Sequence, residues 1–297
     1  MSRRDAVLLI LVGAAWGAVY PLTAVALREL SPAAVVVVRT GLSTLALAPF
    51  ALRADVLRHV RARLPAVLVA AALQATIPLI LMTTGQQHVS SGLAGILLAS
   101  QPVWATVLVA STERAVRPRQ SLGVLVGFAG IALLFARDLH GRTTAWAGAT
   151  LLAAAVFYAA GTVYMRHAIP DVPPLATAAV AMTASTVALL PFAASDLPRR
   201  LSLPTAGQLL LLSMVGTGAA LVLFYTLIQR IGAIRANLTG YLAPAFALTY
   251  GAVFLHERIT PQAVAGLILI LAGSYTAAQL PTTTGNRNTA ERIRSPG

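Results

Sequence analysis

The sequence predicts an all-α integral membrane protein with ten transmembrane helices, arranged as two inverted repeats of five helices with both termini in the cytoplasm. The prediction comes from the composition, a set of long uncharged segments and an internal repeat. Hydrophobic residues make up 57% of the chain and charged residues 10%, whereas a soluble domain usually carries about 25% charged residues. This is the composition of a protein surrounded by lipid.

The internal repeat has an offset of 142 residues. The segment STLALAPF at 43–50 recurs as STVALLPF at 185–192, and Pro102 corresponds to Pro244 at the same offset. A unit of five spans crosses the membrane an odd number of times, so its second copy must enter from the opposite side. Inverted repeats of this kind are the architecture of many secondary transporters.

The spans follow from segments without Asp, Glu, Lys or Arg, because a helix needs roughly 20 apolar residues to cross the bilayer. The second span contains one charge, Arg39, the third and fourth share the uncharged stretch 64–112, and the fifth is rich in glycine. The other six are uncharged throughout their predicted length, apart from Arg235 near the start of the ninth. The ten predicted spans are 6–27, 31–52, 64–85, 91–111, 120–136, 145–165, 173–194, 204–229, 234–255 and 261–280.

The domain organisation follows from the repeat. The first five-helix repeat is predicted at 1–136 and the second at 145–280, with a linker at 137–144. The first span is longer than the 7–15 apolar residues of a signal peptide and matches the start of the second repeat, so we interpret it as a retained helix. The polar tail 281–297 is predicted to be disordered and cytoplasmic.

The distribution of arginines predicts the orientation. All 22 basic residues are Arg. With the N-terminus in the cytoplasm, 15 arginines fall in cytoplasmic segments, 6 in outside loops and 1 within a span. Cytoplasmic loops carry the excess of positive charge, so both termini are predicted to be cytoplasmic and the protein to lie in the inner membrane. The net charge of +13 is thus explained by topology, and no nucleic-acid partner is predicted.

Missing residue types exclude several classes of protein. The chain has no cysteine and no lysine, which excludes disulfides, thiolate metal sites, a retinal Schiff base and a Walker A phosphate lysine. Its five histidines are scattered along loops and span ends without an HExxH motif. No metal, cofactor or catalytic residue is predicted, and an enzyme embedded in the membrane is the least favoured alternative.

The charged residues near the spans define further expectations. All nine carboxylates lie at or beyond span ends, which favours uniport or exchange of a neutral or zwitterionic solute; proton coupling through a group such as His88 remains open.

Arg39 either holds a substrate carboxylate or is structural, snorkelling outward or pairing with Glu29 or a carbonyl. Glu113 and Glu257 follow the fourth and ninth spans, where a Glu opposes the helix dipole, so a role in bonding loop amides or latching a gate is predicted.

Polar and aromatic residues inside the spans are the candidates for substrate binding. Several pairs lie one helical turn apart and share a face, and buried amides need a polar partner, either substrate or a neighbouring helix. The predicted substrate-binding residues are Trp16, Tyr20, Gln74, Gln101, Tyr158, Thr162, Asn237 and Tyr241. Proline bends a helix, and the alternative to a hinge is a packing kink. The predicted hinge or gating residues are Pro21, Pro78, Pro102 and Pro244.

Pairs of glycines predict where helices approach closely. Gly13 and Gly17 are predicted to pack beside the cavity, and Gly123 and Gly127 to serve as scaffold or as a dimer contact.

These features resemble the EamA-type transporters of the drug/metabolite transporter superfamily. The resemblance is carried by Trp16-Gly17, by Arg39, and by the segments SSGLAGILLASQPVWATVLVASTER at 90–114, GVLVGFAGIALL at 123–134 and IRANLTGYLAPAFALTYGAVFLHER at 234–258. It implies ten helices, cytoplasmic termini and a central cavity between the repeats. The second repeat departs from the first, with Phe157 in place of Trp16 and Ala181 in place of Arg39.

The predicted function is that of a secondary transporter working by alternating access. Its expected solute is a small metabolite, most simply an amino acid or similar zwitterion, and the resemblance implies export or facilitated exchange. The alternative is a multidrug or other metabolite exporter coupled to protons. The expected partners are the solute and the lipid bilayer, and the chain is expected to be a monomer or homodimer.

Overall fold

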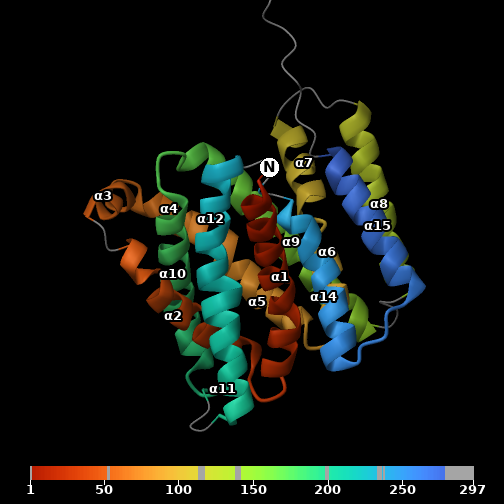
Figure 1. Ribbon diagram of the computed structural model, residues 1–297, viewed down its shortest axis with the longest axis horizontal. Coiled ribbons are helices and arrows are strands. Elements are labelled where there is room, and N and C mark those ends of the chain that lie inside the picture. The colour runs from red at the N-terminus through yellow and green to blue at the C-terminus, as the bar shows by residue number, and fades with distance from the viewer. Residues whose placement is uncertain are drawn as a thin grey trace, which may run out of the picture.

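The computed structural model describes residues 2–51, 54–112, 118–137, 142–197, 201–232, 236 and 238–277, and this part of the chain is almost entirely helical (Figure 1). Two π-helical segments interrupt the α-helices. The elements are α1 (Arg3–Ala26), α2 (Pro32–Ala51), α3 (Ala54–Ala62), α4 (Leu64–Ala71), η1 (Ala72–Thr76), α5 (Ile77–Gly85), α6 (Ser91–Leu98), α7 (Gln101–Thr112), α8 (Pro118–Arg137), α9 (Arg142–Ala168), α10 (Pro174–Ala193), α11 (Leu203–Leu210), η2 (Leu211–Ala219), α12 (Ala220–Ile231), α14 (Thr239–Leu255) and α15 (Pro261–Ala277).

The predicted class, a helical membrane protein, is confirmed. Eight helical segments of the described chain are long and apolar enough to cross a membrane, and they coincide with the first eight predicted spans. The ninth and tenth coincide with shorter apolar helices, Thr239–Leu255 and Pro261–Ala277, whose 17 residues are at the lower limit for a span. The tail 281–297 and residues 138–141 of the linker lie outside the described residues.

The helices pair in the same way in both halves of the chain. α2 packs against α10 and α8 against α15, so the second and fifth helices of each repeat contact their counterparts. α1 packs against α14 and against η2–α12, while α9 packs against α6–α7 and η1–α5. Figure 1 shows α8 and α15 at one edge of the molecule and α10 near the other, with α1 between them. The first helix of each repeat therefore forms the centre of the bundle.

Both third helices contain a π-helical segment at the same place. η1 begins after the eight residues of α4, and η2 begins after the eight residues of α11. The repeat-matched serines bind these segments: Ser43 Oγ donates to the carbonyl of Ser213 at 3.0 Å, and Ser185 Oγ lies 2.8 Å from Thr76 Oγ1. Because π-helical turns are frequent at functional sites, the two segments mark the third helices as candidates for the site.

The structure differs from the expected elements at two places. Residues 54–62, expected as a loop, form the short helix α3. The fourth span breaks at Ala99 and Ser100 between α6 and α7, immediately before Gln101 and Pro102. Pro102 has no N–H to continue the α-helical ladder. By contrast, Pro21 and Pro244 lie inside continuous helices, and Pro78 follows η1 directly.

Small residues allow the closest helix contacts. A β-carbon at Gly13 would lie 2.8 Å from Leu242 Cβ, so α1 and α14 touch through this glycine. On α8, Gly123 faces α15, where a β-carbon at Gly123 would lie 2.8 Å from the Gly273 carbonyl oxygen. A β-carbon at Gly127 would lie 2.6 Å from Val103 Cγ2 of α7, and its backbone contacts Gly273. This small-residue face of α8 is therefore used within the chain.

Candidate functional site

Arg39 lies buried in the middle of α2, with only 6% of its surface exposed. Its Nε donates a hydrogen bond of 2.9 Å to Thr217 Oγ1 in η2. Its Nη1 is buried and has no hydrogen-bond partner in the described structure. The expected alternative, pairing with Glu29, does not occur, because Glu29 binds Ser202 and Thr205 instead. The guanidinium is thus a buried cation with a free donor.

Tyr20 of α1 and Tyr158 of α9 accompany Arg39. Both lie close enough for their hydroxyl groups to interact electrostatically with the guanidinium and with each other. Gln86 Nε2 donates to the carbonyl of Tyr20 at 3.1 Å, while Gln86 Oε1 is buried without a partner. The first helices of the two repeats and the second helix of the first repeat therefore converge on one charge.

The two predicted amides meet α9 within one turn of Tyr158. Gln101 Nε2 donates to Thr162 Oγ1 at 3.3 Å, and Thr162 Oγ1 donates to the carbonyl of Tyr158 at 2.9 Å. Gln74, in η1, lies over Gly161, where a β-carbon would be 2.5 Å from Gln74 Oε1. This oxygen is buried without a partner.

These residues form one group, here termed the central polar cluster. It joins α1, α2, η1, α7, α9 and η2, with Tyr158 linking its two sides. Its members are Tyr20, Arg39, Gln74, Gln86, Gln101, Tyr158, Thr162 and Thr217.

The other predicted residues lie elsewhere. Trp16 packs against Phe224 of α12, with ring centroids 4.8 Å apart. Tyr241, on α14, lies near Tyr275 of α15. Asn237 falls outside the described residues. The structure therefore groups Tyr20, Gln74, Gln101, Tyr158, Thr162 and Arg39. Within the described residues, no hydrogen bond or ring contact joins Trp16 or Tyr241 to them.

Sequence reasoning missed two members of the cluster. Gln86 is an amide within the uncharged stretch 64–112 and carries the same signal as Gln74. Thr217 is one of many hydroxyl residues in the spans and has no distinguishing signal. Its Oγ1 also donates to the carbonyl of Leu212, five residues earlier, so its position depends on the π-helical register.

Carboxylates join the repeats at the face opposite the N-terminus. Gly13 packs on Leu242 and Gly17 on Phe246, so α1 and α14 run parallel and end at this same face, here termed the distal face (Figure 1). Following α14, Glu257 accepts hydrogen bonds from the N–H groups of Ser91 and Gly92 at 2.8 and 3.2 Å. The expected bond from a Glu to loop amides is confirmed for Glu257, while Glu113 lies outside the described residues.

A second carboxylate, Glu29, lies at the distal face. It accepts hydrogen bonds from Ser202 Oγ at 2.7 Å and from Thr205 Oγ1 at 2.6 Å. Hydrogen bonds from Thr205 and Ser202 lower the pKa of Glu29 below its usual value. Both carboxylates lie at helix N-termini, of α6 and α11, where free N–H groups and the helix dipole favour negative charge.

The opposite face is joined by ion pairs. Arg230 Nε donates to Asp5 Oδ1 at 2.7 Å, and Arg63 lies 3.9 Å from Asp171. Within the described residues, no group of three or more His, Asp or Glu side chains could hold a metal ion.

The fourth span contacts different partners along its length. α6, at the distal face, packs against α14, whereas α7 packs against α8, α9 and α15 and touches α14 at most marginally. The two halves of the chain therefore meet through α14 at the distal face and through α9 and α15 along α7.

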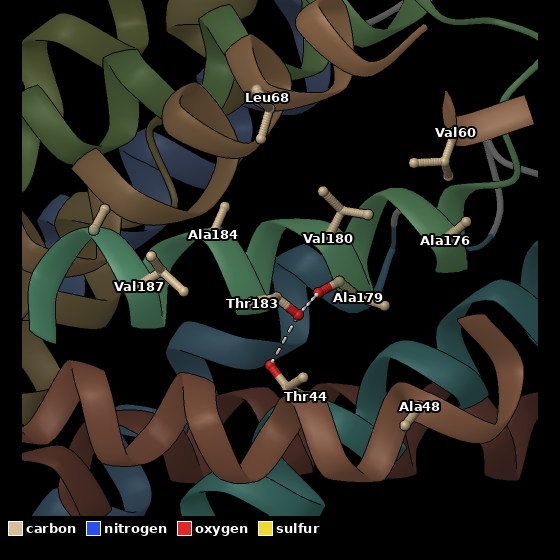
Figure 2. Close-up of a pocket in the computed structure, with 11 residues that line it drawn as sticks. Thr44, Ala48, Val60, Leu68, Ala176, Ala179, Val180, Thr183, Ala184 and Val187 are labelled. Atoms are coloured by element: carbon tan, nitrogen blue, oxygen red, sulfur yellow. Dashed lines mark hydrogen bonds between the residues drawn. The ribbon is translucent and has the colours of Figure 1, made fainter. Parts of the chain in front are cut away.

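An apolar groove of about 590 Å³ lies apart from the cluster. It runs along α10 between α2 and α4, and it contains no residue of the central polar cluster (Figure 2). A smaller apolar hollow of about 320 Å³ lies between α2 and η2–α12.

Comparison with known proteins assigns the family. A family model, the EamA-like transporter family, matches residues 4–136 and again 145–278. An uncharacterized transporter of Bacillus subtilis is 28% identical over 91% of this chain and 90% of its own length. A probable terminal-alkyne amino-acid exporter of Streptantibioticus cattleyicolor is 28% identical over 89% of this chain and 90% of its own length.

One further relative and one solved structure are similar to this chain. A probable amino-acid metabolite efflux pump of Salmonella typhimurium is 28% identical over 62% of this chain and 66% of its own length. A solved crystal structure shares the fold with a TM-score of 0.67 at 16% identity, covering 93% of this chain and 98% of the other. The chain is a multi-pass membrane protein that belongs to the EamA-like transporter family.

Proposed function

We propose that this chain exports a small zwitterionic metabolite, most simply an amino acid, across the inner membrane by alternating access. Ten spans with both termini in the cytoplasm complete the proposed topology, in agreement with the excess of arginine on that side. Two relatives named as exporters of amino acids or their metabolites support the class of solute.

The observation that carries this proposal is the buried guanidinium of Arg39. Burying a charge is costly unless it is paired and hydrogen-bonded. Nη1 has no partner in the described structure, and the carboxylates with described partners lie at or beyond helix ends: Asp5, Glu29, Asp171, Asp196 and Glu257. A solute carboxylate would supply the missing counter-charge.

The rest of the cluster suits the other parts of a zwitterion. An ammonium group needs acceptors, and the oxygens Oε1 of Gln74 and Gln86 are buried without partners. The rings of Tyr20 and Tyr158 add apolar surface beside Arg39. We therefore assign the solute carboxylate to Arg39 and the solute ammonium to this amide side of the cluster.

Alternating access requires contacts that open and close on each face. In the proposed cycle, Glu257 and Glu29 release the N-termini of α6 and α11 when the distal face opens. The break before Pro102 and the two π-helical segments are the places at which the helices bend, because their hydrogen-bond ladders are already interrupted.

The experiment is counterflow in proteoliposomes containing the full chain. Vesicles loaded with unlabelled amino acids should accumulate a trace of the labelled amino acid transiently. Competition by each amino acid is compared with competition by its carboxamide, which lacks the carboxylate. In native protein, the amino acid should compete about 30-fold or more strongly than its carboxamide, because truncating one partner of a buried charge pair costs at least that much affinity. Arg39→Gln should abolish this difference.

Arg28→Gln is the matched control, because Arg28 lies outside α1 and α2 and outside the cluster. Acid and amide competing equally in the native protein would reject the role of Arg39. Absence of accumulation for every amino acid, with accumulation of a drug under a proton gradient, would favour the multidrug alternative.

A further inference from the structure

We propose that the groove along α10 binds one anionic phospholipid, with an acyl chain in the groove and the headgroup on the arginines of α3. The proposal concerns a lipid site and does not depend on the identity of the transported solute.

The groove has the chemistry of an acyl-chain site. In Figure 2, α10 runs between Leu68 of α4 on one side and Thr44 of α2 on the other. The hydroxyl of Thr183 donates to the carbonyl of Ala179 and lies 3.4 Å from Thr44 Oγ1, so its hydrogen-bonding needs are met within the protein. The groove-lining side chains are otherwise Ala, Val and Leu.

The dimensions of the groove match one leaflet. Its residues on α10 extend from Ala176 to Ala188, about 18 Å at 1.5 Å per residue. Half of a hydrocarbon core is about 15 Å thick. Leu68 and Val187 are 45% and 67% exposed, so the groove opens sideways, toward the lipid of a protein that spans the membrane.

A basic amphipathic helix closes one end of the groove. Val60 of α3 lines the groove next to Ala176 and is only 7% exposed (Figure 2). On the same short helix, Arg58 and Arg61 are exposed and have no ion-pair partner among the side chains that the structure describes, which do not include Asp55. Apolar residues on one side and arginines on the other are typical of a helix that lies at the surface of an anionic membrane.

The local charge remains positive after the two acidic neighbours, Asp55 and Asp171, are counted. Asp171, in the loop before α10, lies 3.9 Å from Arg63, and both side chains are largely exposed. Asp55, on α3 itself, offsets one further charge. Arg58, Arg61 and Arg63 still exceed Asp55 and Asp171 in charge, so a headgroup with net negative charge gains more than a zwitterionic one, and the occupant is a phospholipid with net negative charge.

The test measures lipids retained by the purified full chain in detergent, by native mass spectrometry. Phosphatidylglycerol and phosphatidylcholine with identical acyl chains are the probes. Native protein should retain phosphatidylglycerol more tightly. The double variant Arg58→Gln/Arg61→Gln should weaken its retention about 30-fold, roughly fivefold for each charge, and Arg58→Lys/Arg61→Lys should keep it.

Two controls separate this site from general surface charge and general lipid contact. Arg3→Gln/Arg4→Gln removes the same charge at the exposed start of α1 and should leave retention unchanged. Ala184→Phe fills the groove and should weaken retention of both lipids, whereas Ala132→Phe on the exposed side of α8 should not.

The outcomes decide the proposal even if one variant folds poorly, because the groove variant and the lysine variant are independent of the glutamine pair. Equal losses in both glutamine pairs would overturn it. Unchanged lipid retention in Ala184→Phe would also overturn it. So would a native protein that is a dimer without bound lipid and that Ala184→Phe converts to a monomer, because a second copy of the chain would then occupy the groove.

Discussion

The carboxylate of Glu257 accepts a hydrogen bond of 2.8 Å from the N–H of Ser91 and so joins the end of α14 to the start of α6. The same carboxylate accepts a bond of 2.8 Å from Ser91 Oγ. α14 ends just before it, where His256 adopts a left-handed conformation with a φ of 56°. This turn directs Glu257 back onto the N-terminus of α6, whose free N–H groups favour a negative charge.

Replacing Glu257 with Gln should open the distal face. Hydrogen bonds to a charged group contribute about 1.5–3 kcal/mol, so the open population should rise by roughly tenfold or more. Because the chain has no cysteine, a single cysteine at the buried Ala94 of α6 can report opening through its rate of reaction with a maleimide.

The control for this variant is Asp196→Asn. Asp196 follows α10, and within the described structure its carboxylate accepts a hydrogen bond from the hydroxyl of the neighbouring Ser195 alone. Labelling should match that of native protein. Equal labelling rates in Glu257→Gln and Asp196→Asn would show that the Glu257 contact does not hold this face closed.

Acid should weaken the Glu29 contact in a defined pH range. Its pKa is lowered in the folded protein by hydrogen bonds from Thr205 and Ser202, so its stabilising contribution is fully present above the unfolded pKa of about 4.3. The contribution is lost as the pH falls from there through the lower folded pKa. The unfolding temperature, measured from pH 6 to pH 3, should therefore fall more steeply for native protein than for Glu29→Gln. If the unfolding temperatures of the two proteins fell in parallel with pH, the Glu29 contact would not have this role.

Removing the hydroxyl of Thr217 should misplace Arg39. Thr217→Val deletes the acceptor for Arg39 Nε and leaves a second buried donor unsatisfied, at a cost of about 1–3 kcal/mol. The KM for transport should rise roughly tenfold, with little change in the maximal rate. Thr217→Ser, which keeps the hydroxyl, should have the KM of native protein. If Thr217→Val changed only the unfolding temperature, Thr217 would be structural alone.

Glycine contacts between α8 and α15 should be sensitive to size. A β-carbon at Gly273 would clash with the backbone of Gly127, and overpacking usually costs about 1–3 kcal/mol. Gly273→Ala should lower the unfolding temperature measured in detergent. Gly240→Ala is the control, because a β-carbon there meets nothing within 4 Å. An unchanged unfolding temperature in Gly273→Ala would mean that α8 and α15 can move apart without a loss of stability.

The candidate site could be predicted only in part. The sequence identifies polar residues in apolar spans, because each stands out against a hydrophobic background, and six predicted residues lie in the central polar cluster. It could not identify Thr217, whose position depends on the five-residue hydrogen bond of η2. Nor could it separate Trp16, which packs on Phe224, from Tyr20 one turn later on the same helix.

The sequence by itself determined that this is a helical membrane protein built from a repeated unit, with one arginine inside a span. These properties follow from composition, segment length and local similarity, which need no knowledge of packing. Tertiary structure decided which polar groups meet, which carboxylate binds which helix end, and where the short helix α3 and the groove along α10 lie. Those contacts join residues far apart in the chain, and their geometry depends on helix register and packing.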